Sequence, residues 1–269
     1  MEPGFPPSEI DTSRPHPARM YDAYLGGKDN YAVDQEAVRK VLRAAPEMRD
    51  VARANRAFLQ RAVRFLVGEA GIRQIIDIGT GIPTAGNVHE VAGEIAPETR
   101  VVYVDNDPIV HVHANALLTG SGTTRIVLAD LRQPEKILAD PKVRDTIDFS
   151  QPVALLLVAI LHFITEEENP ARIVATLRDA LPSGSYLALS HGTADFRTEA
   201  ATTAMAVYDT ATSTVTLRTH AQIEAFFDGF DLVEPGLVQA PLWHPDGKPP
   251  RPKDLEKMWI YGGMGRRRE

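Results

Sequence analysis

The 269-residue sequence predicts an α/β fold, in which a parallel sheet is covered by helices on both faces and preceded by a helical extension. From residue 73 onward, short and nearly uninterrupted apolar stretches alternate with segments of helical periodicity. Strands buried on both faces have such uninterrupted apolar runs, and helices connect parallel strands. Before residue 73 the apolar residues recur only at helical spacing, so this region is expected to lie outside the sheet.

The N-terminal region divides into two parts. Residues 1–17 carry five prolines and few large apolar side chains, so an extended leader is expected. In residues 18–72 apolar side chains recur at helical spacing in two stretches, which Pro46 separates and which end near Gly71. We therefore expect residues 18–72 to form a helical cap beside the sheet.

Three tyrosines of this cap, Tyr21, Tyr24 and Tyr31, flank the pair Gly26–Gly27. A glycine pair can act as a hinge, so one interpretation is a lid that closes over a ligand and excludes water. The alternative is that the tyrosines are aromatic anchors that pack the cap onto the sheet. Tyr21 is kept as a candidate catalytic residue.

The alternating region contains seven expected strands and the helices between them. The strands are expected at 74–78, 100–105, 124–129, 152–159, 185–190, 230–238 and 258–262. The connecting helices are expected near 86–95, 109–118, 135–140, 169–181 and 219–229. The proline-rich segment 241–252 is expected to be a loop. No internal repeat is found, so a single domain over residues 1–269 with its core at 73–269 is the economical interpretation.

Two of the expected strands end in polar residues whose spacing is typical of a nucleoside site. The first ends in Asp77-Ile78-Gly79-Thr80-Gly81, and the second ends in Asp105, 24 residues after Gly81. Glycines let the backbone approach a ligand closely, and a carboxylate on the next strand accepts hydrogen bonds from ribose hydroxyls. We therefore expect a cofactor that contains adenosine at this edge of the sheet.

The same residues favour S-adenosylmethionine (SAM) over a dinucleotide. The segment from Gly79 to Thr84 lacks the third glycine of the G-x-G-x-x-G fingerprint. Asp77 lies two residues before the first glycine, where its carboxylate would repel a pyrophosphate but attract the ammonium of a methionyl group. No G-x-x-x-x-G-K-[ST] phosphate loop occurs. A tight turn without a ligand is the structural alternative.

Three motifs resemble the first three motifs of class I SAM-dependent methyltransferases: 77–81, 104–108 and 129–131. The stretches 14–30, 155–162 and 261–266 are similar to a narrower group, the S-adenosyl methyltransferase family. The resemblance extends from about residue 11 to residue 268. It implies a Rossmann-like sheet of seven strands whose last strand is antiparallel, and SAM as the cofactor. It does not imply a particular methyl acceptor.

The resemblance also implies roles for residues at the strand ends. Gly79 and Gly81 would line the methionyl end of SAM, and Asp105 would bind the ribose hydroxyls. Asp105 is the strongest of the acidic candidates because it directly ends an apolar strand. The remaining candidates at this end of the cofactor are Asp77, Thr80 and Ala159.

The adenine would be bound by residues that follow the second and third strands. The resemblance implies that Asn106 flanks the ring, that Asp130 accepts a hydrogen bond from the adenine amino group, and that Leu131 donates its backbone N–H. Asp107 and Asp130 have an alternative interpretation as helix N-caps or turn residues.

Methyl transfer needs alignment and a dry site, and it needs a base only if the acceptor carries a proton. His162 is the best candidate base because it follows the fourth strand; a packed, hydrogen-bonded histidine is the alternative. His191, after the fifth strand, is a weaker candidate. The fourth strand is not followed by Asn/Asp-Pro-Pro-Tyr/Phe, which disfavours methylation of the amino groups of bases.

No metal site is expected. His111 and His113 are two residues apart and point to different sides of a helix. The acidic run 166–168 is expected to be a solvated approach to the next helix. The absence of cysteine excludes disulfides, thiolate zinc sites and cysteine nucleophiles.

Composition and charge narrow the class of protein. A net charge of −7 disfavours nucleic acid as a partner, and no apolar run approaches the ~20 residues needed to cross a bilayer. No secretory signal is recognised, so a soluble, cytoplasmic methyltransferase with a small-molecule acceptor is expected. The alternatives are a non-catalytic SAM-binding module, an NAD-dependent oxidoreductase and a nucleic-acid methyltransferase. The oligomeric state is left open.

Overall fold

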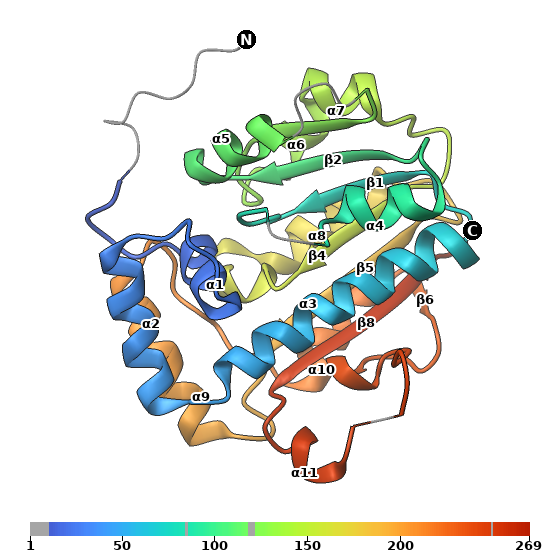
Figure 1. The fold of residues 1–269 in the computed structure, drawn as a ribbon. Helices are drawn as coiled ribbons and strands as arrows, with labels where there is room; N and C mark the ends of the chain where they lie inside the picture. Colours follow the sequence, from blue (N-terminus) through green and yellow to red (C-terminus); the bar gives the residue numbers. More distant parts are fainter. Residues whose placement is uncertain (1–10, 84–85, 118–121, 249) are drawn as a thin grey trace.

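The computed structural model describes residues 11–83, 86–117, 122–248 and 250–269. In this part of the chain a sheet of eight strands lies at the centre, with the order β3-β2-β1-β4-β5-β8-β6 and with β7 paired to β8 (Figure 1). The strands are β1 (Gln74–Ile78), β2 (Arg100–Asp105), β3 (Thr124–Leu128), β4 (Ala154–Val158), β5 (Tyr186–Gly192), β6 (Phe230–Leu232), β7 (Val238–Gln239) and β8 (Ile260–Arg267).

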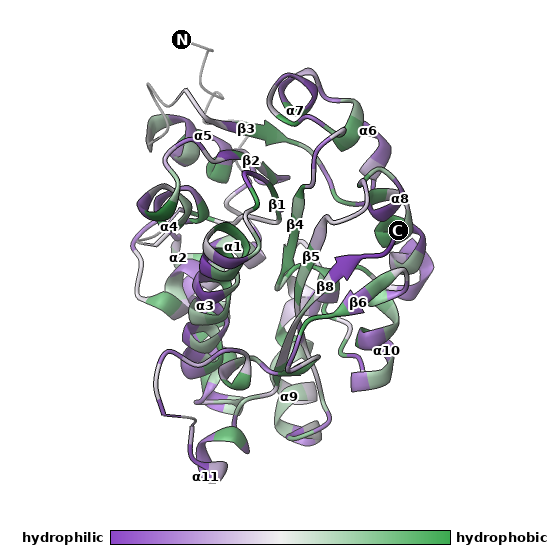
Figure 2. Ribbon diagram, turned by 90° about the vertical axis from the view of Figure 1, so that its right-hand side faces the viewer, coloured by the Kyte–Doolittle hydropathy of each residue, from purple (hydrophilic) through white to green (hydrophobic). Residues whose placement is uncertain are grey.

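Helices cover both faces of this sheet. The α-helices are α1 (Pro17–Leu25), α2 (Ala32–Ala44), α3 (Met48–Arg64), α4 (Val88–Ile95), α5 (Pro108–Leu117), α6 (Pro134–Ala139), α7 (Pro141–Thr146), α8 (Pro170–Asp179), α9 (Thr198–Met205), α10 (His220–Glu224) and α11 (Pro252–Leu255). Side chains of α1–α4 and α9 share one core cluster, whereas those of α6–α8 and α10 share another. Figure 2 shows hydrophobic strands between helices that also carry hydrophilic residues.

Alternating strand residues divide between the two cores. In β1, Ile75 packs in the first cluster and Ile76 in the second; in β2, Val101 packs in the first and Val102 in the second. Successive side chains of a strand point to opposite faces, so both faces of the sheet are buried. This confirms the predicted α/β fold with helices on both faces.

The parallel and antiparallel strands are arranged as the resemblance implied. β1 to β5 pair in parallel, and β8 runs antiparallel between β5 and β6. The carboxyl ends of β1 to β5 therefore meet at one edge of the sheet. Figure 1 shows the N-terminal helices α1 and α2 beside this edge.

The C-terminal third differs from the expectation. The single strand expected at 230–238 is two strands, β6 and β7, because a turn intervenes: Gly236 has φ +87° and donates to the carbonyl of Val233 at 2.8 Å. The last strand is also longer than expected and runs to Arg267, because β5 pairs with it from Ile260 to Arg266 and β6 pairs with it at Arg267. The strand count is consequently eight instead of seven in the described residues.

Some helices also depart from the expectation. α7, α9 and α11 were not expected, and the helix expected at 219–229 is α10 followed by a 3-10 turn. The first helix begins at Pro17, within the leader expected to be extended, because His16 caps it by accepting the N–H of Ala18. Residues 1–10 of the leader lie outside the described residues. Among the described helices, none combines the length and apolar character that a membrane span needs.

Candidate functional site

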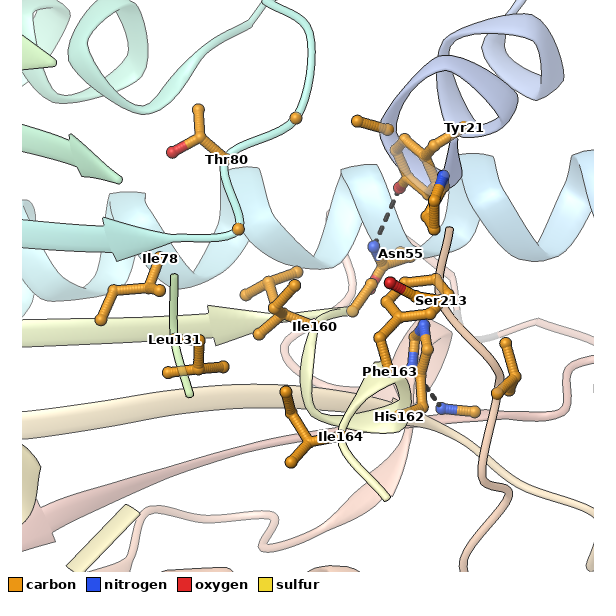
Figure 3. Close-up of a pocket in the computed structure, with 18 of the residues that line it drawn as sticks. Tyr21, Asn55, Ile78, Thr80, Leu131, Ile160, His162, Phe163, Ile164 and Ser213 are labelled. Atoms are coloured by element: carbon orange, nitrogen blue, oxygen red, sulfur yellow. Dashed lines mark hydrogen bonds between the residues drawn. The ribbon is translucent and has the colours of Figure 1, made fainter. Parts of the chain in front are cut away.

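A cavity opens where the carboxyl ends of the parallel strands meet, beneath α1 and α3 (Figure 3). All the candidate cofactor and catalytic residues line it, although they come from five separate parts of the chain. They are Tyr21, Asp77, Gly79, Thr80, Gly81, Asp105, Asn106, Asp130, Leu131, Ala159 and His162.

The turn after β1 requires its glycines. Gly79 has φ +78° and Gly81 has φ +69°, a region that residues with a Cβ rarely adopt. A Cβ on Gly79 would lie 2.6 Å from Cγ1 of Ile160, whereas one on Gly81 would meet no atom within 4 Å. The backbone at Gly81 is therefore open to close approach by a ligand.

Asp105 joins the turns that follow β1 and β2. Its Oδ2 accepts the N–H of Gly81 at 2.8 Å, and its Oδ1 accepts the N–H of Asp107 at 2.9 Å. Burial raises the pKa of Asp105, and these two N–H groups oppose that rise. Each carboxylate oxygen has a second lone pair, so the side chain can still accept hydrogen bonds from a ligand.

Asp77 is a buried carboxyl group that lines the cavity. Burial raises the pKa of Asp77 to about 7; the positive charge of Arg56 opposes this rise and the carboxylate of Asp105 adds to it. The sequence analysis missed Arg56, which lies on α3 and lines the cavity. A carboxyl group of this kind gains from a cationic ligand group, which an ammonium supplies and a pyrophosphate does not.

The turn after β3 is held by an arginine that the sequence analysis also missed. Asp130 accepts the backbone N–H of Arg132 at 2.9 Å, the turn role given as its alternative, and still lines the cavity. Arg132 donates to Glu168 and to the carbonyl of Phe163, which joins this turn to the segment after β4. Asn106 lies close by, with its Nδ2 3.5 Å from Oδ2 of Asp130.

In the acidic run 166–168, Glu166 and Glu167 are exposed, as expected, and two of the three carboxylates also make ion pairs. Glu168 pairs with Arg132, and Glu166 pairs with Arg218 at 2.7 Å. The described residues contain no group of three or more His, Asp or Glu side chains that could hold a metal ion. His111 and His113 contact separate partners, Asn115 and Asp29.

Ala159 directly follows β4 and has a backbone conformation that is uncommon for a residue with a side chain. Its φ is +55°, and its N–H donates to Oγ of Ser190 at 2.9 Å. Ser190 donates in turn to Asn55 of α3, whose Nδ2 donates to the hydroxyl of Tyr21 at 2.9 Å. A continuous set of hydrogen bonds therefore joins α1, α3, β5 and the end of β4.

Tyr21 is engaged in this set. Its hydroxyl donates to the carbonyl of Ala52 at 3.0 Å, and burial raises its pKa. The hydroxyl is therefore protonated at neutral pH, with its proton already bound to a backbone acceptor. These contacts favour a positioning role over proton abstraction.

His162 is held as a neutral hydrogen-bond donor in the turn after β4. The N–H of Gly192 donates to its Nδ1 at 3.4 Å, so the ring proton resides on Nε2. Burial, together with the charge of Arg218, lowers the pKa of His162 to about 3. Its geometry therefore favours donation of a hydrogen bond from Nε2 over the role of general base.

A buried arginine fixes the turn that carries His162. Arg218 is 3% exposed, and its Nη1 donates to Nε2 of His191 at 2.9 Å and to the carbonyl of Leu161 at 3.0 Å. His191 donates from Nδ1 to the carbonyl of Gly192 at 2.7 Å. His191 thus supports the site from behind and does not line the cavity.

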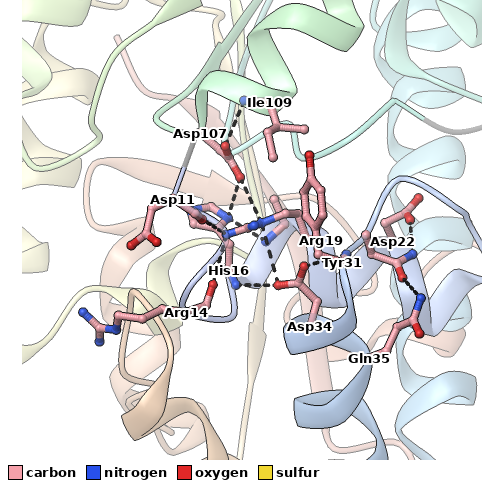
Figure 4. A network of polar contacts seen from close by, with 12 residues as sticks. Asp11, Arg14, His16, Arg19, Asp22, Tyr31, Asp34, Gln35, Asp107 and Ile109 are labelled. Atoms are coloured by element: carbon pink, nitrogen blue, oxygen red, sulfur yellow. Dashed lines mark hydrogen bonds and ion pairs between the residues drawn. The ribbon is translucent and has the colours of Figure 1, made fainter. Parts of the chain in front are cut away.

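The N-terminal cap is attached to the loop after β2 by buried polar side chains (Figure 4). Nδ1 of His16 lies 3.0 Å from Oδ2 of Asp107, and Nε of Arg19 lies 3.7 Å from carboxylate oxygens of both Asp34 and Asp107. Asp107 also caps α5 by accepting the N–H of Ile109 at 2.9 Å, as its alternative interpretation anticipated. His16 lines the cavity as well.

A family model described as S-adenosyl methyltransferase matches residues 4–268. The chain belongs to this family. It is therefore a SAM-dependent methyltransferase, as the motifs at the strand ends predicted. None of the curated proteins matches the chain.

Solved structures similar to the methyltransferase include a DUF574 family protein from Streptomyces avermitilis. It is 48% identical, with a TM-score of 0.92 over 96% of this chain and 99% of that one. A methyltransferase candidate from Thermobifida fusca is 42% identical, with a TM-score of 0.92 over 98% and 99%. The N-methyltransferase NodS from Bradyrhizobium japonicum, solved with S-adenosylhomocysteine (SAH), shares the fold at 13% identity, with a TM-score of 0.50 over 87% and 98%.

The residues at the strand ends fit SAM in their chemistry. The open backbone at Gly81 admits a ligand, Asp77 offers a carboxyl group for an ammonium, and Asp105 has lone pairs for hydroxyls. The arginines and the hydrogen bonds that hold these residues come from distant parts of the sequence, which is why local spacing gave no sign of them.

Proposed function

We propose that this methyltransferase transfers the methyl group of SAM to a small-molecule acceptor bound in the same cavity. The observation that carries the proposal is the extent of the cavity. Its lining continues beyond the candidate cofactor residues to Met205, Leu217 and Trp259. These further walls can border a second small molecule beside the cofactor.

In this proposal each strand end has a task. Asp77 pairs with the ammonium of the methionyl group, and Gly79, Thr80 and Gly81 approach that group through their backbone. Asp105 accepts the ribose hydroxyls. The adenine lies among Asn106, Asp130 and Leu131, and Ala159 borders the methyl group.

SAM, when bound, supplies an electrophilic methyl group on a sulfonium that is its own leaving group. The protein therefore has to align the acceptor and exclude water. Tyr21 and Asn55 position α1 and α3 over the cavity, and His162 offers its Nε2–H to the acceptor. Neither Tyr21 nor His162 has to remove a proton from the acceptor in this proposal.

Calorimetric titration of SAH into wild type and Asp105→Asn tests the cofactor site. The variant loses a charged acceptor for two hydroxyls, so we expect binding weaker by about 1–3 kcal/mol. Asp145→Asn, at an exposed position on α7, is the matched control and should bind as wild type. Unchanged affinity in a folded Asp105→Asn protein would remove Asp105 from the site.

Assays on the same purified protein distinguish the proposed function from the alternative functions. A non-catalytic SAM-binding module would bind SAH but transfer no methyl group from radiolabelled SAM to any acceptor. An oxidoreductase would bind NADH, which the missing third glycine and Asp77 both disfavour. The net charge of −7 argues against nucleic acid as the acceptor.

A further inference from the structure

The lining of the cavity is charged in one half only. Apart from His162 and the tyrosines, its ionisable residues lie at the ends of β1, β2 and β3 or contact these ends. Arg56 donates to Asn87 in the segment after β1 at 2.9 Å, and His16 meets Asp107 after β2. The six residues are Asp77, Asp105, Asp130, Arg132, Arg56 and His16. We call this part the cofactor half.

The other part, here called the acceptor half, is lined by residues that follow β4 and β5 or precede β8, and by the first turn of α3. Glu47, next to Met48 of α3, pairs with Arg197 at 3.5 Å, which brings this end of α3 to the segment after β5. The walls include Met48, Val51, Phe163, Met205, Leu217 and Trp259. Figure 3 shows Thr80 and Leu131 at one end of the cavity, and Phe163, His162 and Ser213 at the other.

The described residues that line the acceptor half include no Asp, Glu, Lys or Arg. Its polar groups are largely paired with each other: the hydroxyl of Tyr208 lies 3.2 Å from that of Tyr24, and Asn55 binds Tyr21 and Ser190. A charged acceptor would lose its hydration there without gaining a counterion, which costs several kcal/mol. The acceptor half therefore selects against charge.

Two residues of this half can donate to an uncharged acceptor. His162 does so through Nε2–H, since Gly192 occupies Nδ1, and Ser213 does so through its hydroxyl, which lines the cavity. The indole N–H of Trp259 has no hydrogen-bond partner within the described part of the chain, but it is too buried to reach a ligand. The rings of Phe163, Tyr208 and Trp259 supply flat apolar walls, which suit an aromatic ligand.

The donor at His162 also discriminates between oxygen and nitrogen. A neutral amine has one lone pair, and if that pair accepts a hydrogen bond it is not free to attack a methyl group. A hydroxyl oxygen has two lone pairs, so it can accept the Nε2–H and attack with the other. The geometry therefore favours methylation at oxygen.

We propose that the methyl acceptor is an uncharged phenol whose hydroxyl oxygen binds Nε2–H of His162 in the acceptor half. This inference rests on the proposed function. The acceptor oxygen forms a bond to the methyl carbon, the carbon–sulfur bond breaks with its electron pair left on sulfur, and the hydroxyl proton leaves to solvent water at the open side of the cavity. The products are an aryl methyl ether and SAH.

Three phenols of similar length and different charge test the inference: 4-propylphenol (neutral), tyramine (cationic) and 3-(4-hydroxyphenyl)propanoate (anionic). Each is titrated at pH 7.5 into the protein saturated with SAH, whose own titration is recorded first. We expect 4-propylphenol to bind at least about tenfold more tightly than either charged analogue. With radiolabelled SAM, we expect the label in the methyl ether of 4-propylphenol.

The role of His162 is tested with propylbenzene, which lacks the hydroxyl. Wild type should prefer 4-propylphenol to propylbenzene by roughly five- to tenfold, the value of one hydrogen bond. His162→Phe keeps a ring but removes the donor, so this preference should vanish while SAH affinity stays unchanged. Leu217→Glu should weaken the binding of 4-propylphenol and strengthen the binding of tyramine. Leu217→Met should change neither affinity.

The outcomes separate the two proposals. If SAH does not bind, the proposed function fails and this inference fails with it. If SAH binds but a charged phenol binds as well as 4-propylphenol, or none of the three binds, the inference alone is overturned. Label on the nitrogen of tyramine would overturn it too.

Discussion

A single buried carboxyl group, that of Asp77, makes the cofactor site sensitive to pH. Burial raises the pKa of Asp77 to about 7 from its ordinary value of 3.8. Between these values the folded protein keeps a proton that the unfolded chain has released. The unfolded state then binds fewer protons, so the contribution of Asp77 to the free energy of unfolding falls as pH rises through this window.

The same proton opposes binding of a cationic ligand group. SAH should bind more tightly as pH rises, by about tenfold per unit below pH 7, and should level off above it, because the pairing requires the carboxylate. The Asp77→Asn variant should bind SAH weakly, and its affinity should not rise with pH. Without ligand, its melting temperature at pH 8 should be higher than that of wild type. Calorimetry and thermal melts at several pH values measure both effects.

Asp145→Asn should retain the pH dependence of wild type. A flat affinity in wild type across pH 5.5 to 8.5 would contradict the pairing of Asp77 with the ammonium.

Residue spacing predicted residues that line the cavity, but it did not predict their protonation states. The strand-end positions of Asp77 and Asp105 follow from short apolar runs, which the sequence displays directly. The tautomer of His162 does not, since it depends on the N–H of Gly192 from another strand. A residue's type identifies its chemistry, but its protonation depends on neighbours that the fold supplies.

At the scale of elements, the packing of α3 on β8 depends on a residue without a side chain. A Cβ on Gly262 would lie 2.9 Å from Cδ2 and Cε2 of Phe58, which is fully buried and packs edge-on against Trp243 at 5.5 Å. The contact between Phe58 and Gly262 fixes how closely α3 packs on β8. Because α3 carries Asn55 and Arg56, the contact also positions these two residues in the cavity.

Gly262→Ala should therefore lower the free energy of unfolding by about 1–3 kcal/mol, because the methyl group overpacks this contact. Phe58→Leu in the same chain should recover part of the loss. Gly93→Ala is the control: its Cβ meets no atom within 4 Å in α4, so stability should rise by up to about 1 kcal/mol. Urea denaturation compares the variants, and equal effects at Gly262 and Gly93 would refute the close packing.

The elements themselves were predictable where their pattern is local. β1 and β2 have the expected bounds because each is a short, mostly apolar stretch with polar residues at its limits. The end of β8 was not predictable from the sequence, since its glycines and arginines become a strand only through pairing with neighbouring strands. α7 and α9 are short, and short helices depend on tertiary contacts more than on their own periodicity.

For the whole molecule, we propose that the cap and the core form one folding unit with α1 as a lid. One apolar cluster includes Met20 and Tyr24 of α1 together with Val101 of β2 and Trp259. His16 and Arg19 attach the same helix to the loop after β2. A ligand held at that loop would therefore hold the cap in place.

We expect a single thermal transition that SAH raises, with stabilisation of about 2.7 kcal/mol at a hundred times its Kd. Trypsin cleavage after Lys28, which is exposed beside Gly26–Gly27, should slow when SAH is bound. Cleavage after Lys253, exposed on α11, is the control and should not change. Two separate transitions would contradict one folding unit, and equal cleavage at Lys28 with and without SAH would contradict the lid.

The sequence by itself determined the fold class, the family and the set of residues at the strand ends, because apolar runs, glycine turns and their spacing are properties of neighbouring residues. The tertiary structure alone decided that Arg56, Arg132 and Arg218 hold the site together and that one half of the cavity is free of charge. These features arise where segments far apart in the chain meet. The spacing of residues along one segment does not predict which other segments pack against it.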